Sequence, residues 1–186
     1  MQFKRIAEMR FIAIKDIVNT ISETHKFNKP SLKAINTSDI FNGELFDVPY
    51  SKTTDLKGQF KKTIKKNDIL FSEIRPANRR FAKVTIDETQ DFVVSTKLMV
   101  LRKFNDEVDL DYFYFYITNQ SFLDILQRRA ENRIGSFPQI TFDLLGEYQI
   151  PLPSLEEQKR IASVIFTLDK KISNKQELNR NLPLSA

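Results

Sequence analysis

The C-terminal part of the sequence constrains the fold more than any other segment. Pro151 and Pro153 make a rigid turn, and Ser154 with Glu157 three residues later has the spacing of a capping box, which marks a helix start. From Gln158 onward, apolar residues recur at alternating steps of three and four, which is the a/d pattern of a coiled coil. The seam residues that we expect to pair with a second helix are Ile161, Ile165, Leu168 and Ile172.

This helix needs a partner for its apolar seam. A helix of about 26 residues is about 39 Å long, which is too long and too one-sided to be satisfied by solvent alone. The partner is a helix of this chain or of another one. The alternative is a C-terminal helix that lies across its own domain.

The preceding 150 residues have the pattern of an α+β domain. Asn42-Gly43 and the segment 65–68 are turn signals. The aromatic-rich segment that follows Asp109 suits two short helices broken near Asn119, with its rings assigned to the core, and base stacking as the alternative. The segments that we predict as strands are 32–35, 69–72, 81–86, 92–95 and 98–101.

The composition argues against an enzyme. The chain has no cysteine, and His25 is its only histidine, so we expect neither a zinc site nor a Cys–His nucleophile. With four glycines and no GxGxxG or P-loop motif, a nucleotide cofactor has no binding signature. Turn capping and charge pairing account for Asp39, Asp68 and Glu73 better than a metal cluster does. We therefore expect no catalysis, no cofactor and no metal.

No run of about 18 apolar residues suggests a membrane span, and the first residues lack the apolar core of a signal peptide. A cytoplasmic protein is the expectation that follows.

The excess positive charge is concentrated in one window of the sequence. The net charge is +5, yet residues 51–83 alone hold ten Lys and Arg against three Asp and Glu. Such a patch attracts polyanions, most commonly nucleic acid. The alternative is a solvated, lysine-rich loop and strand edge.

Four blocks of the sequence carry a resemblance to a known family. They are 35–40 with Gly43, 66–76, 94–96 with 100–101, and 135–140 followed by 144–153 and the helix. Block 66–76 reads KNDILFSEIRP and looks like the "gDil-s-rp" segment of specificity subunits of type I restriction–modification enzymes. The order and spacing of the blocks resemble one target recognition domain of that family with its conserved spacer helix.

The resemblance implies an architecture and a set of partners. It implies an α+β fold, with a mixed-sheet, DNA-binding target recognition domain at 1–150 and a coiled-coil-type spacer or dimerisation helix at 151–186. Such subunits are non-catalytic and read a split site in double-stranded DNA. They direct methyltransferase subunits, which methylate adenine, and restriction subunits, which cleave unmodified DNA.

Two departures from the family pattern leave alternatives open. The early tryptophan is absent, with Phe11 as its candidate substitute, and one recognition domain stands where the family has two. The chain is then a half-subunit that dimerises through its helix, or a fragment of a longer subunit. The rival functions are a general nucleic-acid adaptor with a coiled-coil tail, and the recognition domain of a fused restriction–methyltransferase.

Candidate contact residues follow from the charge pattern and from the loops. Base readout uses Arg on guanine and Asn or Gln on adenine. The base-contact candidates are Arg75, Asn78, Arg79, Arg80, Ser136 and Gln139. The phosphate-contact candidates are Lys61, Lys62, Lys65, Lys66 and Arg133. For each of them the alternative is a solvated charge or polar group in a loop.

Overall fold

Two four-stranded sheets form the centre of a computed structural model that describes residues 10–56, 58–132 and 139–181. The first sheet is antiparallel and has the order β2-β11-β8-β9, with β2 at Val18–Thr20, β11 at Leu98–Lys103, β8 at Ile69–Ser72 and β9 at Phe81–Lys83. The second has the order β6-β3-β10-β7, with β6 at Tyr50–Lys52, β3 at Ser31–Ile35, β10 at Phe92–Ser95 and β7 at Phe60–Lys62. Because β10 pairs with β3 in parallel and with β7 antiparallel, the sheet is mixed, as predicted.

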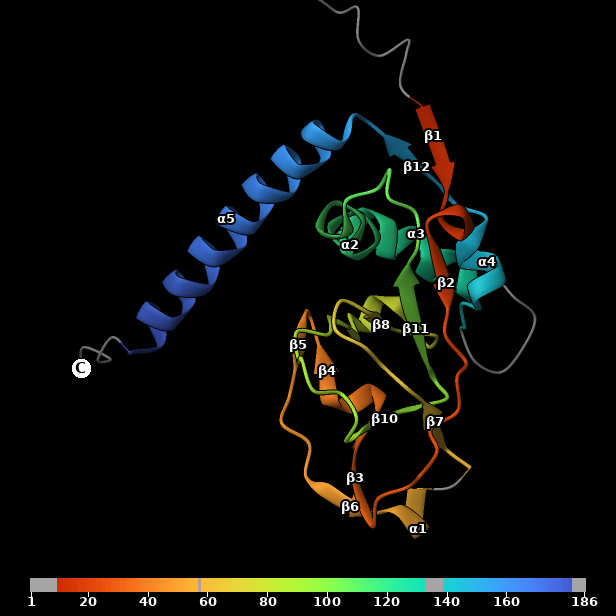
Figure 1. Cartoon of the computed structure of the whole chain (residues 1–186). Helices are drawn as coiled ribbons and strands as arrows, with labels where there is room; N and C mark the ends of the chain where they lie inside the picture. Colours follow the sequence, from red (N-terminus) through yellow and green to blue (C-terminus); the bar gives the residue numbers. More distant parts are fainter. Residues whose placement is uncertain (1–9, 57, 133–138, 182–186) are drawn as a thin grey trace, which may run out of the picture.

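The remaining elements surround these sheets (Figure 1). Two short ribbons pair β1 (Arg10–Ala13) with β12 (Gln149–Leu152), and β4 (Ile40–Phe41) with β5 (Glu44–Leu45). The short helical turns are η1 (Ile14–Asp16), η2 (Thr37–Asp39), η3 (Pro76–Asn78), α1 (Thr53–Leu56) and α4 (Phe142–Gly146). The longer helices are α2 (Leu110–Thr118), α3 (Gln120–Glu131) and α5 (Leu155–Asn181). None of the described helices is long and apolar enough to cross a membrane.

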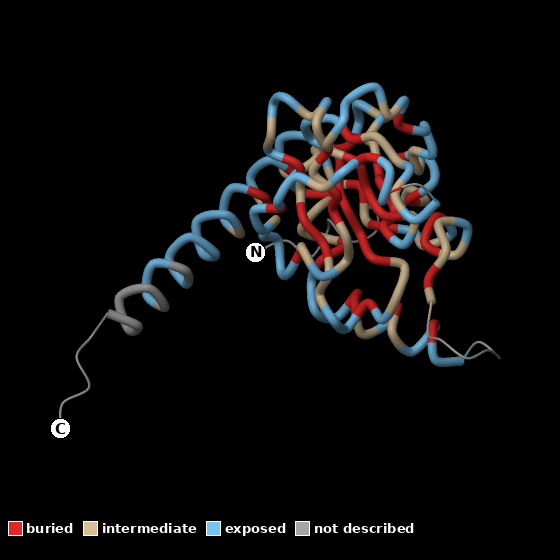
Figure 2. The backbone as a smooth tube through the Cα atoms, turned by 90° about the horizontal axis from the view of Figure 1, so that it is seen from below, coloured by how far each residue is buried: buried red, intermediate tan, exposed pale blue. Residues whose placement is uncertain are grey.

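The first sheet is covered on both faces, which places it in the middle of three layers. Along β8, Ile69 and Phe71 pack into the cluster that contains the helices, while Leu70 packs into the cluster shared with the second sheet. Met99 and Val100 of β11 divide in the same way. We call the part of the chain that precedes α5 the body. Figure 2 shows that the buried residues are concentrated in it.

This double coverage corrects the prediction for 81–86. We predicted a strand over 81–86 from the alternation of its apolar residues, which is typical of a strand with one face in water. Instead, β9 ends at Lys83, and Phe81 and Ala82 are both buried. The two side chains point to different apolar layers, so neither of them meets water. Val84 is also buried, beyond the end of the strand.

The paired helices after Asp109 are confirmed, and their caps explain the break between them. Asp109 accepts a hydrogen bond from the backbone N–H of Tyr112 at 3.0 Å, and Asn119 accepts one from Phe122 at 2.9 Å. These side chains satisfy donors that the first turn of a helix leaves free. The aromatic residues of α2 pack into the main core, as predicted, with Phe113 completely buried.

The sequence did not indicate β12. This strand pairs with β1, and its backbone carbonyl at Pro151 accepts a hydrogen bond from the hydroxyl of Tyr112 at 2.8 Å. The domain boundary predicted at residue 150 falls inside β12, so the last strand of the body leads directly into the long helix.

The long helix begins at the predicted place and extends away from the body (Figures 1 and 2). The Ser154 hydroxyl accepts a hydrogen bond from the backbone N–H of Glu157 at 3.3 Å, as the capping spacing predicts. One turn later, Gln158 is completely buried. The helix is therefore anchored at its start by its own domain.

Candidate nucleic-acid interface

Part of the positive charge in the basic window 51–83 is neutralised by ion pairs. Three of its cations have carboxylate partners, since Lys66 pairs with Asp87 at 2.6 Å, Lys83 with Asp111, and Lys62 with Glu73 at 3.9 Å. In the described part of the chain, the window cations without a carboxylate partner are Lys52, Lys61, Lys65, Arg75, Arg79 and Arg80. These ion pairs therefore leave fewer cations of the window free to attract an anion.

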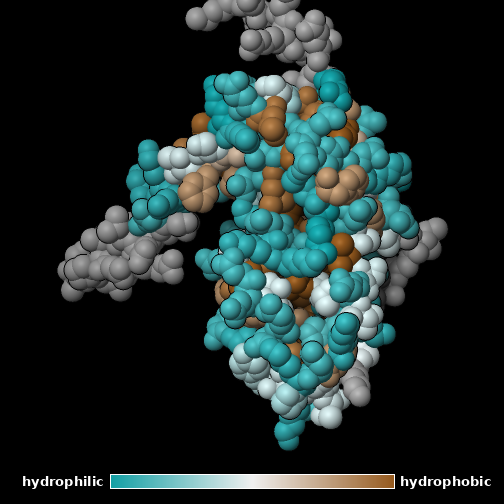
Figure 3. Space-filling view, in the orientation of Figure 1, coloured by the Kyte–Doolittle hydropathy of each residue, from teal (hydrophilic) through white to brown (hydrophobic). Residues whose placement is uncertain are grey.

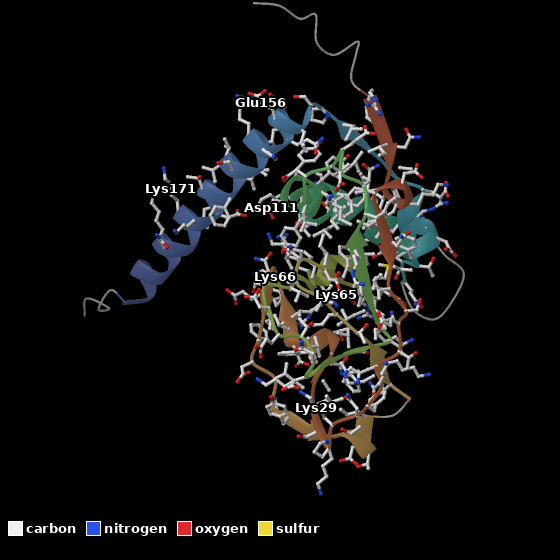
Figure 4. All side chains as sticks on the ribbon, in the orientation of Figure 1. Lys29, Lys65, Lys66, Asp111, Glu156 and Lys171 are labelled. Carbon is white, nitrogen blue, oxygen red and sulfur yellow. The ribbon has the colours of Figure 1, made fainter. Side chains whose placement is uncertain are left out.

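The lysines predicted to contact phosphate have different surroundings. Lys61 and Lys65 are exposed, and Lys66 is exposed although paired. Lys65 and Lys66 lie in the middle of the body, whereas Lys29 lies at its far end (Figure 4). Lys62 points inward instead. Its ammonium donates to the carbonyls of Leu98 at 2.7 Å and Thr96 at 3.3 Å, and burial lowers its pKa.

The turn at 75–80 holds four of the predicted base-contact residues. Its centre is η3, in which Pro76 is buried and stands at the first helical position. Arg75 and Arg79 flank η3 with φ of 47° and 54°, which is a left-handed conformation that non-glycine residues rarely adopt. Such a backbone persists only where surrounding contacts enforce it.

The four side chains of this turn divide into two kinds. Arg79 donates from Nε to Asn42 Oδ1 at 2.8 Å and from Nη1 to Gln120 Oε1, and its guanidinium lies 5.7 Å from the ring centre of Phe81. Arg80 donates to the carbonyl of Ile40 at 3.0 Å. Both are thus held against the body.

Arg75 and Asn78 differ, because both are exposed and their side chains have no partner among the described residues. They are the members of the turn that remain available to a ligand.

Gln139, a base-contact candidate far from the turn in sequence, lies close to Glu73, two residues before Arg75. Gln139 donates to Glu73 at 2.7 Å, and the backbone N–H of Ile140 donates to the carbonyl of Glu73 at 2.7 Å. Ile74 and Gln139 also form an isolated bridge. The two candidate regions, separate in sequence, therefore adjoin. Ser136 and Arg133 lie outside the described residues.

The three carboxylates weighed as a metal cluster serve separate local structures. Asp39 accepts from the backbone N–H of Asn36 at 2.8 Å in a capping box. Asp68 is buried and accepts two hydrogen bonds from Arg102, at 2.8 and 2.7 Å. Glu73 binds Gln139. No group of three metal-ligating side chains is found among the residues that the structure describes.

The histidine is likewise part of the body. His25 is buried, its Nδ1 accepts from the backbone N–H of Phe27 at 2.9 Å, and its Nε2 lies 3.2 Å from the carbonyl oxygen of Gln90. These contacts give it a structural role in the loop before β3.

The predicted helix-pairing set is divided between the body and solvent. Ile161 packs against the main core and Ile165 is half-buried, whereas Leu168 and Ile172 are 53% and 54% exposed. The first turns of α5 therefore lie on their own domain, as in the alternative considered above. The C-terminal half of α5 leaves the apolar side chains of Leu168 and Ile172 exposed. Further exposed apolar residues on α5 are Val164 and Phe166.

A crevice of about 410 Å³ separates α5 from the body. Figure 3 shows the hollow between the helix and the body. Ile165, Asp169 and Ile172 line it from α5, and Arg79 and Tyr114 line it from the body. Burial raises the pKa of Tyr114 to about 12, and the nearby carboxylate of Asp169 acts in the same direction.

Sequence reasoning missed the residues that position the turn at 75–80. Asn42 and Gln120 bind Arg79, and Gln127 accepts from the backbone N–H of Ala77 at 3.2 Å. The Asn42-Gly43 turn was visible in the sequence, but its contact with Arg79 was not. Gln120 and Gln127 carry no sequence signal beyond their position on a predicted helix.

Comparison with known proteins defines the class of protein to which this fold belongs. The model of the type I restriction modification DNA specificity domain matches residues 7–184. The chain therefore belongs to this family. This confirms the resemblance deduced from blocks of the sequence.

Individual relatives agree with this assignment. The specificity subunit of the type I restriction enzyme HindI from Haemophilus influenzae is 36% identical over 178 residues, covering 95% of this chain and 39% of that protein. The crystal structure of the HsdS subunit from Thermoanaerobacter tengcongensis matches with a TM-score of 0.77 at 21% identity, covering 95% of this chain and 46% of that one. A solved structure on complex assembly and conformational transition of the type I R-M system matches with a TM-score of 0.78 at 19% identity, over 95% of this chain and 46% of that one. This chain thus spans less than half the length of these relatives.

Proposed function

We propose that this chain reads one half of a split site in double-stranded DNA and directs methyltransferase subunits, together with restriction subunits, to that site. The observation that carries the proposal is the turn at 75–80, which presents an arginine and an asparagine on a body of the specificity family. Neither side chain has a partner among the residues that the structure describes. Arg and Asn are the side chains suited to reading guanine and adenine edges. In this proposal the chain is non-catalytic and works in the cytoplasm.

The proposed contacts follow the surroundings of each residue. Arg75 and Asn78 read base edges together with Gln139, which adjoins the turn through Glu73. Ser136 and Arg133, outside the described residues, stay candidates for a base contact and a phosphate contact. Phosphate contacts come from Lys61, Lys65 and Lys66, which are exposed. Lys62 is left out of this set, because its ammonium is occupied by two backbone carbonyls. Arg80 is held by the backbone of β4 and is a weaker candidate than Arg75.

The family match favours this reading over a general nucleic-acid adaptor. An adaptor would bind through charge alone, so its affinity would depend on salt and not on sequence. The recognition domain of a fused restriction–methyltransferase shares the same DNA-reading mechanism, and the two proposals differ in whether the methyltransferase is a separate chain.

Methyl transfer provides the test of the proposed function. The chain and a type I methyltransferase subunit encoded beside it are mixed with duplex DNA, and labelled methyl groups are mapped. We expect methylation at one bipartite sequence only when both proteins are present. Methylation without this chain, or spread over all sequences, would contradict the proposal.

The Arg75→Ala and Asn78→Ala variants sharpen this experiment. Loss of a good base contact costs about 1–3 kcal/mol of discrimination, so each variant should relax the preferred sequence at one position. Arg10→Ala is the charge-matched control, because Arg10 on β1 forms an exposed ion pair with Glu107. The control should keep the wild-type sequence preference.

The uncovered half of α5 is proposed to pair with a second helix, from another copy or from the other half of a longer subunit. We expect Leu168→Asp with Ile172→Asp to abolish self-association at micromolar concentration and to leave the domain folded, since both side chains are exposed. The mass from light scattering and the thermal unfolding curve measure the two effects. Lys170→Asp, on the same turns but off the seam, is the control. An unchanged mass in the double variant would argue against pairing through this seam.

A further inference from the structure

We propose that Arg79 is a positioning residue that, together with Asn42 and Gln120, holds the turn at 75–78 in its DNA-reading shape. This deepens the proposed function and rests on it. The sequence suggested Arg79 as a base reader, but its Nε and Nη1 groups already donate to side chains of the body, which fix the direction of the guanidinium. The base-reading role then falls to Arg75 and Asn78 on the same turn.

The geometry of the contacts makes Arg79 a link between three elements. Its Nε binds Asn42 in the turn between β4 and β5, and its Nη1 binds Gln120 at the start of α3. The guanidinium also lies over the ring of Phe81 in β9. The planar guanidinium carries several N–H donors and can bind Asn42 and Gln120 at the same time while it packs on Phe81. A lysine ammonium lacks this fixed fork of donors.

The backbone of the turn is tied at the same points. The N–H of Asn42 donates to the carbonyl of Arg79 at 2.7 Å, so Asn42 and Arg79 bind each other through both backbone and side chain. Within the turn, the N–H of Asn78 donates to the carbonyl of Arg75 at 2.8 Å, and that of Arg79 to Pro76 at 3.0 Å. Ala77 is tied to Gln127 on α3.

The backbone conformation supports the same reading. Arg75, Arg79 and Asn42 all have positive φ, at 47°, 54° and 48°. Three non-glycine residues in the left-handed region, within one contact network, need external contacts to stay there. The side-chain bonds of Arg79 supply such contacts. A turn fixed in this way presents the side chains of Arg75 and Asn78 with little conformational freedom to lose on binding DNA.

The variants separate the charge of Arg79 from the geometry of its hydrogen bonds. Arg79→Lys keeps the charge and removes the fork. Asn42→Gly allows the positive φ and removes the acceptor, whereas Asn42→Asp keeps the acceptor. Arg75→Asn removes a reader at a position where Asn tolerates the left-handed backbone. Arg10→Ala serves again as the charge control.

Two measurements are made on each full-length variant. The first is amide hydrogen exchange at Ala77, Asn78 and Arg79 in the free protein. The second is selection from a pool of randomised duplex DNA, which gives the sequence preference, together with the affinity for the unselected pool.

The expected results distinguish a positioning residue from a reader. Arg79→Lys and Asn42→Gly should speed exchange in the turn about tenfold, as the loss of one charge-assisted hydrogen bond would. Both should lose the sequence preference and keep the affinity for the unselected pool, and both should still unfold in one cooperative transition. Asn42→Asp should keep slow exchange. Arg75→Asn should relax the preference at one position of the site without faster exchange.

Three outcomes overturn parts of this picture, and they can be told apart. If Arg79→Lys loses the sequence preference while exchange stays as slow as in the wild type, Arg79 is itself a reader and the positioning role is wrong. The positioning role is also wrong if Asn42→Gly exchanges as slowly as the wild type. If the wild-type protein selects no sequence at all, the proposed function fails, and the exchange data still decide the positioning role.

Discussion

Replacing Asp68 with alanine is expected to destabilise the domain by about 3 kcal/mol, near the lower end of the cost of breaking a buried ion pair from one side. Asp68 is 1% exposed and accepts two hydrogen bonds from Arg102, whose pKa it raises. The carboxylate also accepts from the backbone N–H of Lys65 at 2.7 Å and so closes the turn before β8. Alanine would leave the guanidinium and this N–H without their acceptor.

Urea unfolding measures this effect, with the midpoint expected to fall at an unchanged m-value. Asp87→Ala is the matched control, because Asp87 is 77% exposed in its pair with Lys66 and an exposed pair contributes about 0–1 kcal/mol. If Asp68→Ala cost no more than Asp87→Ala, the buried pair would not stabilise the fold. Asp68 lies in block 66–76, which resembles the family. Its hydrogen bonds to Arg102 and Lys65 give a physical reason for an aspartate at this position.

Replacing Gln158 with alanine is expected to cost about 3 kcal/mol as well, because the completely buried side chain makes three hydrogen bonds to partly buried backbone groups, at about 1 kcal/mol each. The side-chain amide donates to the carbonyls of Glu107 and Pro153, both at 2.9 Å, and accepts from the N–H of Asp109 at 2.8 Å. It thereby joins α5 to the cap of α2. Loss of the Gln158 side chain should therefore broaden the range of angles between α5 and the body, in addition to lowering the free energy of unfolding.

Stability and helix angle are measured separately. Urea unfolding gives the first, with Lys159→Ala, an exposed neighbour on α5, expected to stay within about 0.5 kcal/mol of the wild type. Spin labels on cysteines placed at Lys65 and Lys171 give the second (Figure 4), and no native cysteine interferes. A broader distance distribution in Gln158→Ala is expected. An unchanged distribution would mean that the apolar contacts of Ile161 and Ala162 alone fix the helix.

The local elements were readable from the sequence because their signals act over a few residues. The caps at Asp109 and Asn119 bind backbone three residues ahead, and the Asn42-Gly43 turn joins adjacent strands. The seam of α5 likewise repeats within two turns. The strand β12 and the early end of β9 were not readable, because pairing with β1 and coverage on both faces depend on distant segments.

The sequence by itself determined the long helix, the paired helices after Asp109 and the turns, since hydrogen-bonded turns, caps and heptads are set by near neighbours. The order of its blocks also indicated the family. Only the tertiary structure decided which cations remain available. Arg79 meets Asn42 and Gln120, at separations of 37 and 41 residues, and Lys62 meets the carbonyl of Leu98 across 36. Composition cannot distinguish a bound guanidinium from a free one, because the difference lies in acceptors that folding brings from elsewhere in the chain.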